Sequence, residues 1–336
     1  MINKINHVWL FFTDRCNLGC GYCFYKHRTR QEVMDIGIFK HILEFVRSQA
    51  PLEFIFSGGE PLIEADLLRE MITRIKNEKL DRYISVQTNA TLLNNNLMKF
   101  FLDNGINLEV GIDGKKDTTI KNRPGIEGGD FDDIVHGVNL AVSSKGPLTA
   151  TMTVRPQSVD NLFENLKYLA SIGLRSIEVH PAFLENWDKS ASKIFLDLYR
   201  ESSLWELKEK RYGLIGRGYS KPSTGIWDML ALPNGKVLGN WVLLSFPEEV
   251  RKDFYLMDFG LGPSGQFLKG AKSYFTDLSN FIARNPQSSY RAVSNFNARK
   301  AVETKAGSCY KSRVNSYIEL CEQIEQIDRK MLILYN

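Results

Sequence analysis

The sequence predicts an α/β fold, a partial (β/α)6 TIM-like barrel with a smaller C-terminal α+β extension. The first observation is that short β-type runs alternate with amphipathic helical patterns over the first 205 residues. The second is the number of β–α units, six, which is too few for a closed eight-fold barrel. This order requires parallel strands with right-handed crossovers, and an open partial barrel and a doubly wound sheet both fit it.

Each unit is predicted from its own pattern. Apolar residues between the β-type runs recur at spacings of three and four, which is typical of helices packed on a sheet. Leu68, Met71, Ile72 and Ile75 form one such stripe. The β-type runs lie at about 7–13, 52–56, 82–88, 107–112, 148–154 and 176–180.

One face of four neighbouring strands is polar, because alternate residues of a strand share a face. The opposite, apolar faces are expected to meet the helices, so the polar faces converge on a common interior. A polar interior is costly when dry, which favours a wet or ligand-filled lumen over a closed network of polar groups. The polar positions are Ser85, Gln87 and Asn89, then Asn107, Glu109, Gly111 and Asp113, then Thr149, Thr151, Thr153 and Arg155, then Ser176, Glu178 and His180.

Three parts of the chain are distinguished by composition. Residues 1–205 form the predicted barrel, and residues 206–224, rich in Gly, Ser and basic residues, form a predicted linker or loop. Residues 225–336 form the extension, which opens on a predicted hairpin with a turn at Asn234–Gly235. The remainder of the extension is predicted to be mainly helical.

The composition narrows the class of protein. The chain has 336 residues, 24% of them charged, and a net charge of +4, too mild a basic excess to indicate nucleic-acid binding. No apolar run is long enough to span a bilayer, so no membrane association is expected. Without a signal peptide the protein is expected to be cytoplasmic.

Three of the five cysteines, Cys16, Cys20 and Cys23, fall within eight residues directly after the first predicted strand. Active sites of parallel β/α folds lie at this end of the strands. Thiolates at such close spacing favour an iron–sulfur cluster, whereas a structural zinc site needs four ligands. A zinc site with His27 as the fourth ligand and a chance cluster of core cysteines are the alternatives.

The spacing Cys-x-x-x-Cys-x-x-Cys, with Tyr22 before the last cysteine, resembles the signature of the radical S-adenosylmethionine (radical SAM) superfamily. FSGGEPL, which ends the second strand, resembles the family's Gly-Gly-Glu motif. QTNATLL at 87–93, with Ala90 in place of glycine, and GIDG at 111–114, with Gly111 in place of serine, resemble two further segments. The resemblance covers about residues 5–185 and is strongest to the branch of sulfatase- and peptide-maturating enzymes with a SPASM or twitch extension.

The resemblance implies that Cys16, Cys20 and Cys23 hold one 4Fe–4S cluster whose fourth iron binds SAM. Glu60 is then expected to pair with the methionyl ammonium, and Asp113 to accept from the ribose hydroxyls. Arg123 is a candidate for the methionyl carboxylate, with a surface salt bridge as the alternative. The full set of expected cofactor contacts is Tyr22, Ser57, Gly58, Gly59, Glu60, Gln87, Asn89, Asp113, Arg123, Thr153 and Arg155.

The extension departs from the family pattern. It has no cysteine around the predicted hairpin, where Asn240 stands near an expected cysteine position, and only Cys309 and Cys321 remain further on. Two cysteines are too few for a conventional second 4Fe–4S cluster, so one cluster per chain is expected. Cys321 lies on an apolar helical stripe and is expected to be a buried core residue.

Three residues are candidates for catalysis. Glu178 and His180 end the sixth strand on its inner face, where they can contact substrate, transfer a proton or only bond to neighbouring strands. Cys309 is either inert or a hydrogen-atom donor to a substrate radical.

The resemblance implies reductive cleavage of SAM and removal of a hydrogen atom from a substrate carbon, with flavodoxin or ferredoxin as electron donor. A peptide is the favoured substrate. The alternatives are a redox-neutral rearrangement, epimerisation or oxidation of a small metabolite, and a scaffold protein without activity that binds an iron–sulfur cluster or zinc.

Overall fold

The computed structural model describes residues 4–335 except 30, 50, 52, 81–82, 127–129, 212, 217–225, 262–265, 269–276, 279, 281–289 and 305–306. The strands are β1 (Lys4–Thr13), β2 (Glu53–Gly58), β3 (Tyr83–Thr88), β4 (Asn107–Gly111), β5 (Leu148–Val154), β6 (Ile177–Pro181), β7 (Ile215–Gly216), β8 (Ile226–Ala231), β9 (Lys236–Leu238), β10 (Met257–Asp258) and β11 (Gln266–Phe267). The α-helices are α1 (Ile36–Arg47), α2 (Ala65–Asn77), α3 (Asn95–Asp103), α4 (Lys116–Asn122), α5 (Phe131–Ser144), α6 (Leu162–Ser171), α7 (Lys189–Lys208), α8 (Glu248–Arg251), α10 (Tyr290–Glu303) and α11 (Lys311–Tyr335). Short 3-10 turns are η1 (Pro61–Glu64), η2 (Pro156–Asn161), η3 (Trp241–Ser245), η4 (Lys252–Phe254), η5 (Phe259–Leu261) and η6 (Ser308–Tyr310).

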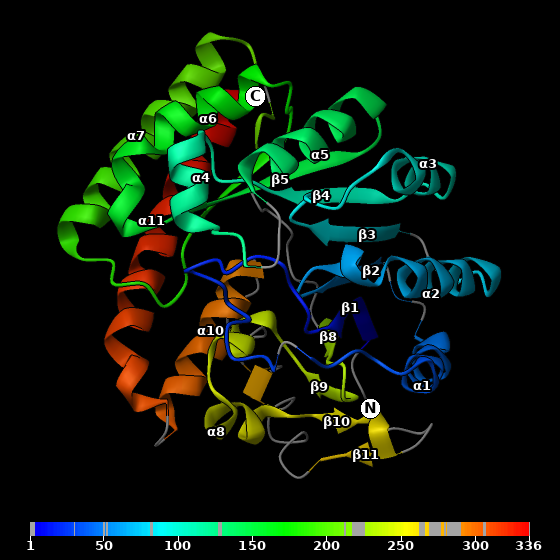
Figure 1. Cartoon of the computed structure of the whole chain (residues 1–336). Coiled ribbons are helices and arrows are strands. Elements are labelled where there is room, and N and C mark those ends of the chain that lie inside the picture. The colour runs from blue at the N-terminus through cyan, green and yellow to red at the C-terminus, as the bar shows by residue number, and fades with distance from the viewer. Residues whose placement is uncertain are drawn as a thin grey trace.

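The parallel strands follow one another in chain order, from β1 to β7, as neighbours in one sheet. A doubly wound sheet reverses its order at a switch point, so this sequential order decides for the open partial barrel. Figure 1 shows α1, α2, α3 and α5 side by side along the outer side of the curved sheet. The predicted α/β fold is confirmed.

The outer face of the sheet is sealed by helices, as the apolar stripes predict. Leu68, Met71, Ile72 and Ile75 of α2 are completely buried. On the strands, Leu108 and Val110 are buried while Glu109 between them is partly exposed. The two faces of the same strand therefore meet different surroundings.

The register confirms that the predicted polar faces lie on one common side. Gln87 is paired with Glu109 across β3 and β4, and Glu109 with Thr149 across β4 and β5. Thr151 is paired with Glu178 across β5 and β6. Paired residues of neighbouring strands project to the same face, so these side chains form one inner surface.

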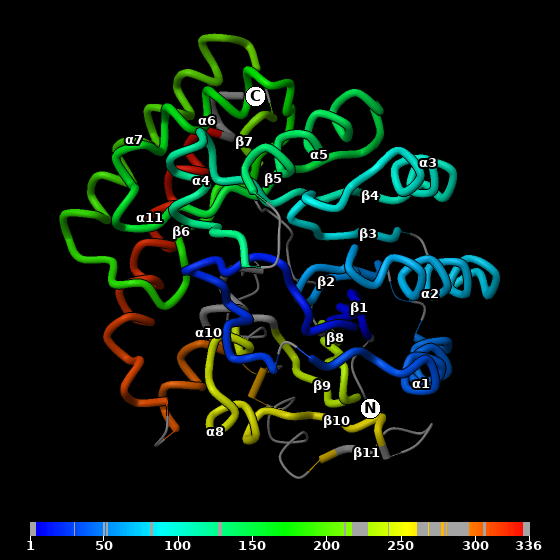
Figure 2. Tube along the Cα trace, viewed as in Figure 1, coloured from blue at the N-terminus to red at the C-terminus, as the bar shows by residue number. Residues whose placement is uncertain are grey.

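The C-terminal part is joined to the barrel sheet. The predicted hairpin is confirmed as β8 and β9, with Gly235 at a φ of +85° in its turn. Its first strand pairs in parallel with β1, and with β10 and β11 the hairpin extends the barrel sheet to eleven strands within the described residues. Figure 2 shows β8, β9, β10 and β11 continuing beyond β1 toward the bottom of the view, with α10 and α11 to their left.

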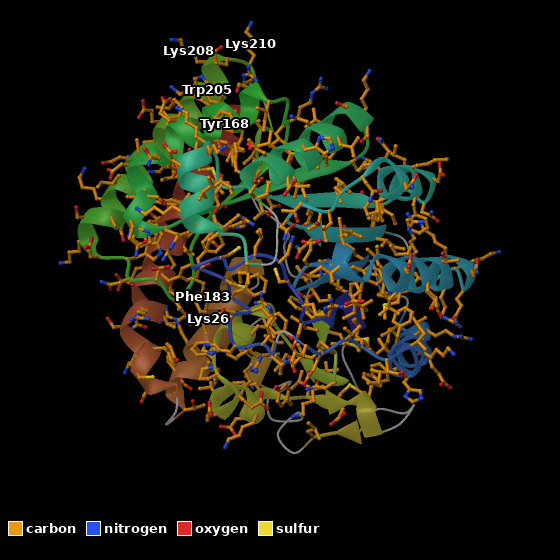
Figure 3. All side chains as sticks on the ribbon, viewed as in Figure 1. Lys26, Tyr168, Phe183, Trp205, Lys208 and Lys210 are labelled. Carbon is orange, nitrogen blue, oxygen red and sulfur yellow. The ribbon has the colours of Figure 1, made fainter. Side chains whose placement is uncertain are left out.

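Helix α11 packs on α7, and a buried hydrogen bond joins them, in which the Tyr199 hydroxyl donates to the Asp328 carboxylate over 2.8 Å. Cys321 of α11 is completely buried, as expected. Figure 3 labels Trp205 and Lys208 at one end of α7 and Phe183, which packs on Tyr317 of α11.

The predicted linker, 206–224, is not all loop. It begins with the last residues of α7 and includes β7. Glu206 is buried, and its carboxylate accepts a hydrogen bond of 3.1 Å from the backbone N–H of Ile215, which holds β7 at the sheet edge. Residues 217–225 of this segment lie outside the described residues. No helix of the described residues is long and apolar enough to cross a membrane.

Candidate functional site

The three clustered cysteines lie on the segment that follows β1 at its carboxyl end, which we call the cysteine loop (residues 14–23). Cys16, Cys20 and Cys23 are all partly buried and free of disulfides. The loop therefore stands where parallel β/α folds build their active sites.

The Gly-Gly-Glu segment at the end of β2 holds the beginning of the cysteine loop. The Gly59 N–H donates to the Thr13 carbonyl over 2.7 Å, and the Glu60 N–H to the Arg15 carbonyl over 2.7 Å. A Cβ at Gly58 would lie 2.4 Å from the Thr13 oxygen, and one at Gly59 would lie 1.9 Å from the Arg15 oxygen. Gly58 and Gly59, which were named among the expected cofactor contacts, thus also leave room for the backbone of the cysteine loop.

The segment after α4 holds the other side of the loop. The Gly19 N–H donates to the Pro124 carbonyl over 2.8 Å, and the Gly21 N–H donates to the Asn122 carbonyl over 3.0 Å. Leu18 and Gly125 form an antiparallel bridge. The loop is thus fixed between two segments that follow different strands.

Two arginines bring positive charge to the cysteines. Arg28 is 9% exposed, and its guanidinium donates to the Cys23 sulfur over 3.2 Å. Burial raises the pKa of the Cys20 thiol to about 12, while the nearby Arg123 acts in the opposite direction. Burial also raises the pKa of Cys16, where Arg28 acts against it. A coordinating metal deprotonates such thiols, and the two guanidinium groups stabilise the resulting negative charge.

Asp113 is completely buried and surrounded by donors. It accepts from the Tyr22 hydroxyl over 2.8 Å, from the Arg123 guanidinium over 2.9 Å and from the Thr153 N–H over 3.1 Å. The Arg123 guanidinium also lies 5.4 Å from the centre of the Tyr22 ring. Asp113 therefore connects the cysteine loop to β5. These contacts differ from the hydrogen bonds to the ribose hydroxyls that were expected of Asp113.

The structure explains why a glycine, Gly111, stands in place of the family's serine. A Cβ at this position would lie 2.5 Å from Nη1 of Arg123. The missing side chain thus leaves the room that the Arg123 guanidinium fills beside Asp113. Arg123 is no surface ion pair, because its side chain is only 9% exposed.

Glu60 is a buried carboxylate that links three segments. It is 1% exposed and accepts from the Leu62 N–H, the Thr88 hydroxyl over 2.6 Å and the Asn89 N–H over 2.7 Å. Burial raises the pKa of Glu60, against the effect of these hydrogen bonds. In the described part of the chain it forms no ion pair.

The QTNATLL segment reaches the cysteine loop through its asparagine. The Asn89 amide donates to Asn17 Oδ1 over 2.9 Å. Ala90, which replaces the family's glycine, has a φ of +66°, a conformation in which glycine is the residue without strain. Gln87 is turned the other way, and its amide donates to Glu109 over 2.6 Å.

The remaining predicted residues fall in different places. Arg155 forms an ion pair of 2.7 Å with Glu185 and lies against Gly21 of the loop, 2.7 Å from where its Cβ would be. His180 and Glu178 lie 3.0 Å apart and are about 40% exposed. Ser57 is buried at the end of β2, whereas Cys309 is exposed on η6 in the C-terminal part.

Residues 10–170 match the family model of the radical SAM superfamily. The chain carries a radical SAM domain. The resemblance inferred from the cysteine, Gly-Gly-Glu and following motifs is confirmed, and the reading as an enzyme is favoured over that of an inert scaffold.

The chain is similar to curated proteins with different names. An uncharacterized protein of Methanocaldococcus jannaschii is 28% identical over 181 residues, 53% of this chain and 63% of that protein. A cysteine-type anaerobic sulfatase-maturating enzyme of Clostridium novyi is 34% identical over 123 residues, 33% of each chain. A GTP 3′,8-cyclase of Clostridium botulinum is 27% identical over 231 residues, 66% of this chain and 69% of the cyclase. The chain thus spans less than two thirds of the first two relatives.

Solved structures share the fold over a longer stretch. The structure described as native anSMEcpe with bound AdoMet aligns with a TM-score of 0.72 at 16% identity, over 98% of this chain and 99% of that one. Streptococcus suis SuiB, solved with its precursor peptide SuiA, aligns with a TM-score of 0.57 at 13% identity, over 72% and 61%. The likeness includes the C-terminal part and shows the fold.

Radical SAM enzymes use a 4Fe–4S cluster and SAM, and the residues around the cysteine loop fit both. Three thiols leave one iron of a cluster for another ligand. Nε of Arg123 and Nδ2 of Asn122 are buried and have no hydrogen-bond partner among the described residues, so each offers a donor to an acceptor such as a carboxylate. Glu60 offers a buried carboxylate to an ammonium.

The zinc alternative with His27 is disfavoured by geometry. Among the described residues no three His, Cys, Asp or Glu side chains converge on a point for a single ion. A 4Fe–4S cluster needs no such convergence, because each thiolate binds a different iron.

Sequence reasoning missed several residues of the site. Arg28, Asn17 and Asn122 contact the cysteine loop or hold it in place. Asn17 lies inside the cysteine motif and Arg28 five residues after Cys23, so proximity in the chain was a signal for both. Asn122 was noted only as the residue before Arg123.

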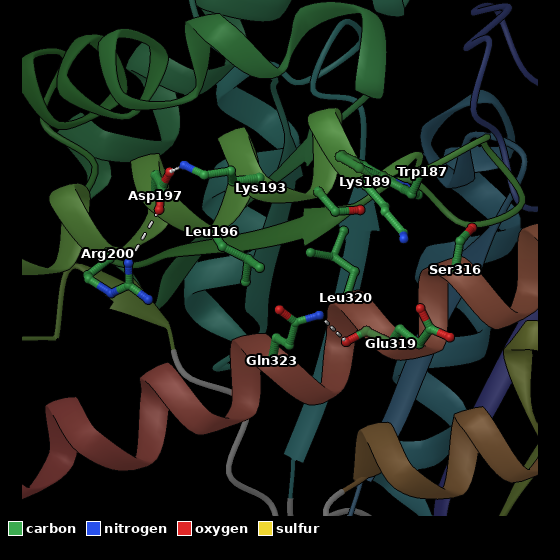
Figure 4. Close-up of a pocket in the computed structure, with 11 residues that line it drawn as sticks. Trp187, Lys189, Lys193, Leu196, Asp197, Arg200, Ser316, Glu319, Leu320 and Gln323 are labelled. Atoms are coloured by element: carbon green, nitrogen blue, oxygen red, sulfur yellow. Dashed lines mark hydrogen bonds and ion pairs between the residues drawn. The ribbon is translucent and has the colours of Figure 1, made fainter.

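A groove of about 400 Å³ lies between α7 and α11, away from the predicted site residues (Figure 4). Its lining includes Trp187 and Leu320 and several charged side chains. Lys193 and Arg200 there are both paired with Asp197. None of the predicted cofactor contacts or cysteines lines this groove.

Proposed function

We propose that this enzyme cleaves SAM reductively on the cysteine loop and removes a hydrogen atom from a carbon of a peptide substrate. When bound, a reduced cluster supplies one electron to the sulfonium of SAM, which yields a 5′-deoxyadenosyl radical that takes the hydrogen atom. The chain contributes the three thiols, the two flanking guanidinium groups and the carboxylate of Glu60. Orientation of the reactants by such fixed groups is a large part of catalysis.

The observation that carries the proposal is the position of the three thiols at the carboxyl end of β1, beside the polar inner face of the sheet. The Thr153 N–H is bonded to Asp113 at the loop, and Thr153 is paired with His180 on the next strand. A substrate on the inner face would therefore lie one strand from the loop residues. Glu178 and His180 are the groups proposed to exchange a proton with it.

A peptide substrate is supported by two likenesses. The Clostridium novyi relative is named as a sulfatase-maturating enzyme, and SuiB was solved with a precursor peptide. A small-molecule substrate is the second candidate, because the similarity to a GTP 3′,8-cyclase extends over 231 residues. An electron donor such as flavodoxin or ferredoxin belongs to either proposal.

One cluster per chain is proposed, because the C-terminal part fills a missing cysteine position with a structural residue. Asn240 is 2% exposed, and its side chain accepts a hydrogen bond of 3.1 Å from the Val242 N–H at the start of η3. After anaerobic reconstitution, about four irons per chain are expected. A count near eight would require a second cluster and overturn this part.

The first experiment measures 5′-deoxyadenosine by mass spectrometry after anaerobic reconstitution and addition of dithionite and SAM. The wild type is expected to form it, and a triple variant with Cys16, Cys20 and Cys23 changed to Ala is expected to form none. Cys309→Ala serves as the matched control, because this cysteine is exposed in the C-terminal part. Equal product from the wild type and the triple variant would contradict the proposal.

The role of Cys309 is tested once a substrate is found. If its thiol donates a hydrogen atom to the substrate radical, Cys309→Ala stops product formation while SAM cleavage continues. Product formation at the wild-type rate would leave Cys309 without a catalytic part. The ratio of SAM consumed to product formed separates an oxidation from a redox-neutral reaction that recycles SAM.

A further inference from the structure

The inner face of the sheet is open to solvent along several strands. Thr149, Thr151 and Thr153 of β5 are partly exposed, while Ala150 and Met152 between them are buried against the helices. The same alternation holds along β4 and β6. Along β4, β5 and β6 the inner surface is therefore neither covered by apolar side chains nor closed off from a ligand.

Carboxylates gather on this surface from four strands. They are Glu53 of β2, Glu109 of β4, Glu178 of β6 and Asp228 of β8. The His7 ring connects two of them, since its nitrogens lie 2.8 Å from Asp228 and 4.0 Å from Glu53. Burial, together with the charges of Glu178 and Glu53, raises the pKa of Glu109 to about 7. The carboxylates are thus close enough to repel one another.

The described inner positions of these strands hold no lysine or arginine to balance this charge. Arg155, beyond the end of β5, is bonded to Glu185. The basic side chains at the described inner positions are His7 and His180, each already beside a carboxylate. Four acidic groups therefore face two weak bases.

An independent sign of a missing donor is Asp228. This residue is 9% exposed and its Oδ1 lies 2.8 Å from His7 Nδ1. Its Oδ2 is buried and has no hydrogen-bond partner within the described residues. A buried carboxylate oxygen left without a donor is costly, so a ligand that supplies an N–H group would be bound there.

The spacing of the carboxylates selects among cations. Neighbouring strands lie about 4.8 Å apart, so Glu109 and Glu178, on alternate strands and two residues apart in register, stand more than about 10 Å apart at the backbone. Glu53 is four residues from the level of Glu109 and lies farther from it still. No three of them converge as a single metal ion would require. An aliphatic chain that ends in an ammonium or guanidinium group fits such an extended row of acceptors.

We propose that the acidic inner face binds a cationic side chain, Lys or Arg, of the peptide substrate. This rests on the proposed function, because it assumes that substrate lies on the inner face beside the cysteine loop. The cation binds within the row of carboxylates that extends from Asp228 on β8 to Glu109 on β4, and places a neighbouring carbon toward the carboxyl end of the sheet. A free diamine would share this chemistry, and the experiment separates the two sources.

The test is calorimetric binding to the reconstituted enzyme with SAM, at pH 7.5 and without oxygen. The probes are N-acetyl-lysine N′-methylamide, its neutral counterpart N-acetyl-norleucine N′-methylamide, and 1,5-diaminopentane. The wild type is expected to prefer the lysine probe over the norleucine probe by roughly tenfold or more. Glu109→Gln and Asp228→Asn test the two parts of the row, and at least one of them is expected to lose most of this preference. Glu44→Gln, which removes an exposed carboxylate from α1, is expected to keep it.

Equal binding of the lysine and norleucine probes by the wild type would overturn the proposal. So would a preference that survives in both inner-face variants. Tighter binding of the diamine than of the lysine probe would assign the site to a free amine and contradict the peptide source. SAM binding is measured in the same samples: its loss in the wild type refutes the proposed function, whereas intact SAM binding without the lysine preference refutes only this inference.

Discussion

Two carboxylates of the barrel, Asp113 and Glu109, have different surroundings. Asp113, at the carboxyl end of the barrel, is completely buried and accepts hydrogen bonds from Tyr22, Arg123 and Thr153. Glu109, in the middle of the inner face, accepts one hydrogen bond among the described residues, from Gln87. Glu109 lies in β4, and Asp113 follows the end of the same strand. The protein balances the charge of Asp113 but not that of Glu109.

This difference matches what each region is proposed to bind. Around the cysteine loop, the groups left without partners are isolated donors, Nε of Arg123 and Nδ2 of Asn122. On the inner face, the buried groups without a partner among the described residues are an acceptor, Oδ2 of Asp228, and an indole donor, Nε1 of Trp9. A fixed cofactor requires a rigid frame with few open positions, while a substrate is bound by charge that the protein leaves uncompensated.

The largest effect is expected from Arg123→Met. This change leaves the completely buried Asp113 without its cation and lowers the free energy of unfolding by about 3–5 kcal/mol, as for other broken buried pairs. Arg155→Met is the control, because the side chains of its pair are 19% and 16% exposed. Urea unfolding of both variants measures the loss. Equal losses would mean that the burial of Asp113 does not set the cost.

The next effect concerns the frame of the cysteine loop. Gly59→Ala places a methyl group on the Arg15 carbonyl and is expected to cost about 1–3 kcal/mol, with less iron bound after reconstitution. Gly105→Ala is the matched control, because a Cβ there meets nothing within 4 Å although its φ is +63°. Iron content and unfolding midpoint are measured together. Full iron loading in Gly59→Ala would show that the loop tolerates the shift.

The sequence allowed the strands, their inner faces and the cysteine loop to be predicted, because each depends on residue types at fixed local spacing. Glu109 and Glu178 were placed on one face by alternation alone, and the register bears this out. The expected cofactor contacts of Gly58 and Gly59 stay a prediction, and the structure shows a second reason for these glycines. A glycine pattern indicates close approach, and the neighbour that approaches, here the Thr13 and Arg15 backbone, is fixed only by the fold.

Long-range pairing was beyond local pattern. Asp228 meets His7 across 221 positions of sequence because β8 adds in parallel to β1, and a hairpin motif does not specify which edge it joins. The Arg28 contact with Cys23 was missed for a different reason. An arginine after a cysteine motif has many surface alternatives, and only its burial distinguishes this one.

The charge of the inner face predicts that the stability of the fold depends on pH through Glu109. Burial and the charges of Glu178 and Glu53 raise its pKa to about 7, from 4.5 in the unfolded chain. The folded state then holds the extra proton between these values, so the contribution of Glu109 to stability falls as pH rises from 4.5 to 7. Glu109→Gln removes this loss and is expected to be more stable than the wild type at pH 8, by about 1 kcal/mol, since the partly exposed site reduces the effect.

Thermal unfolding from pH 5 to 8 tests this expectation. The difference between the variant and the wild type should grow with pH across that range. The His7 ring, which faces Asp228 and Glu53, titrates in both proteins, so the difference isolates Glu109. A difference that stays constant or shrinks toward pH 8 would mean that the carboxylate is compensated in the fold, and the contrast with Asp113 would fail.

The smallest effect is expected in the C-terminal part, at the position where relatives with more clusters are expected to have a cysteine. Asn240→Ala removes the side chain that accepts from the Val242 N–H at the start of η3 and is expected to cost about 1 kcal/mol. Its iron content is expected to equal that of the wild type, because no cluster is proposed there. A lower iron content in Asn240→Ala, with the cysteine loop intact, would show that this residue contributes to a metal centre. The C-terminal part would then bind a cofactor as well, a role that is proposed here for the cysteine loop alone.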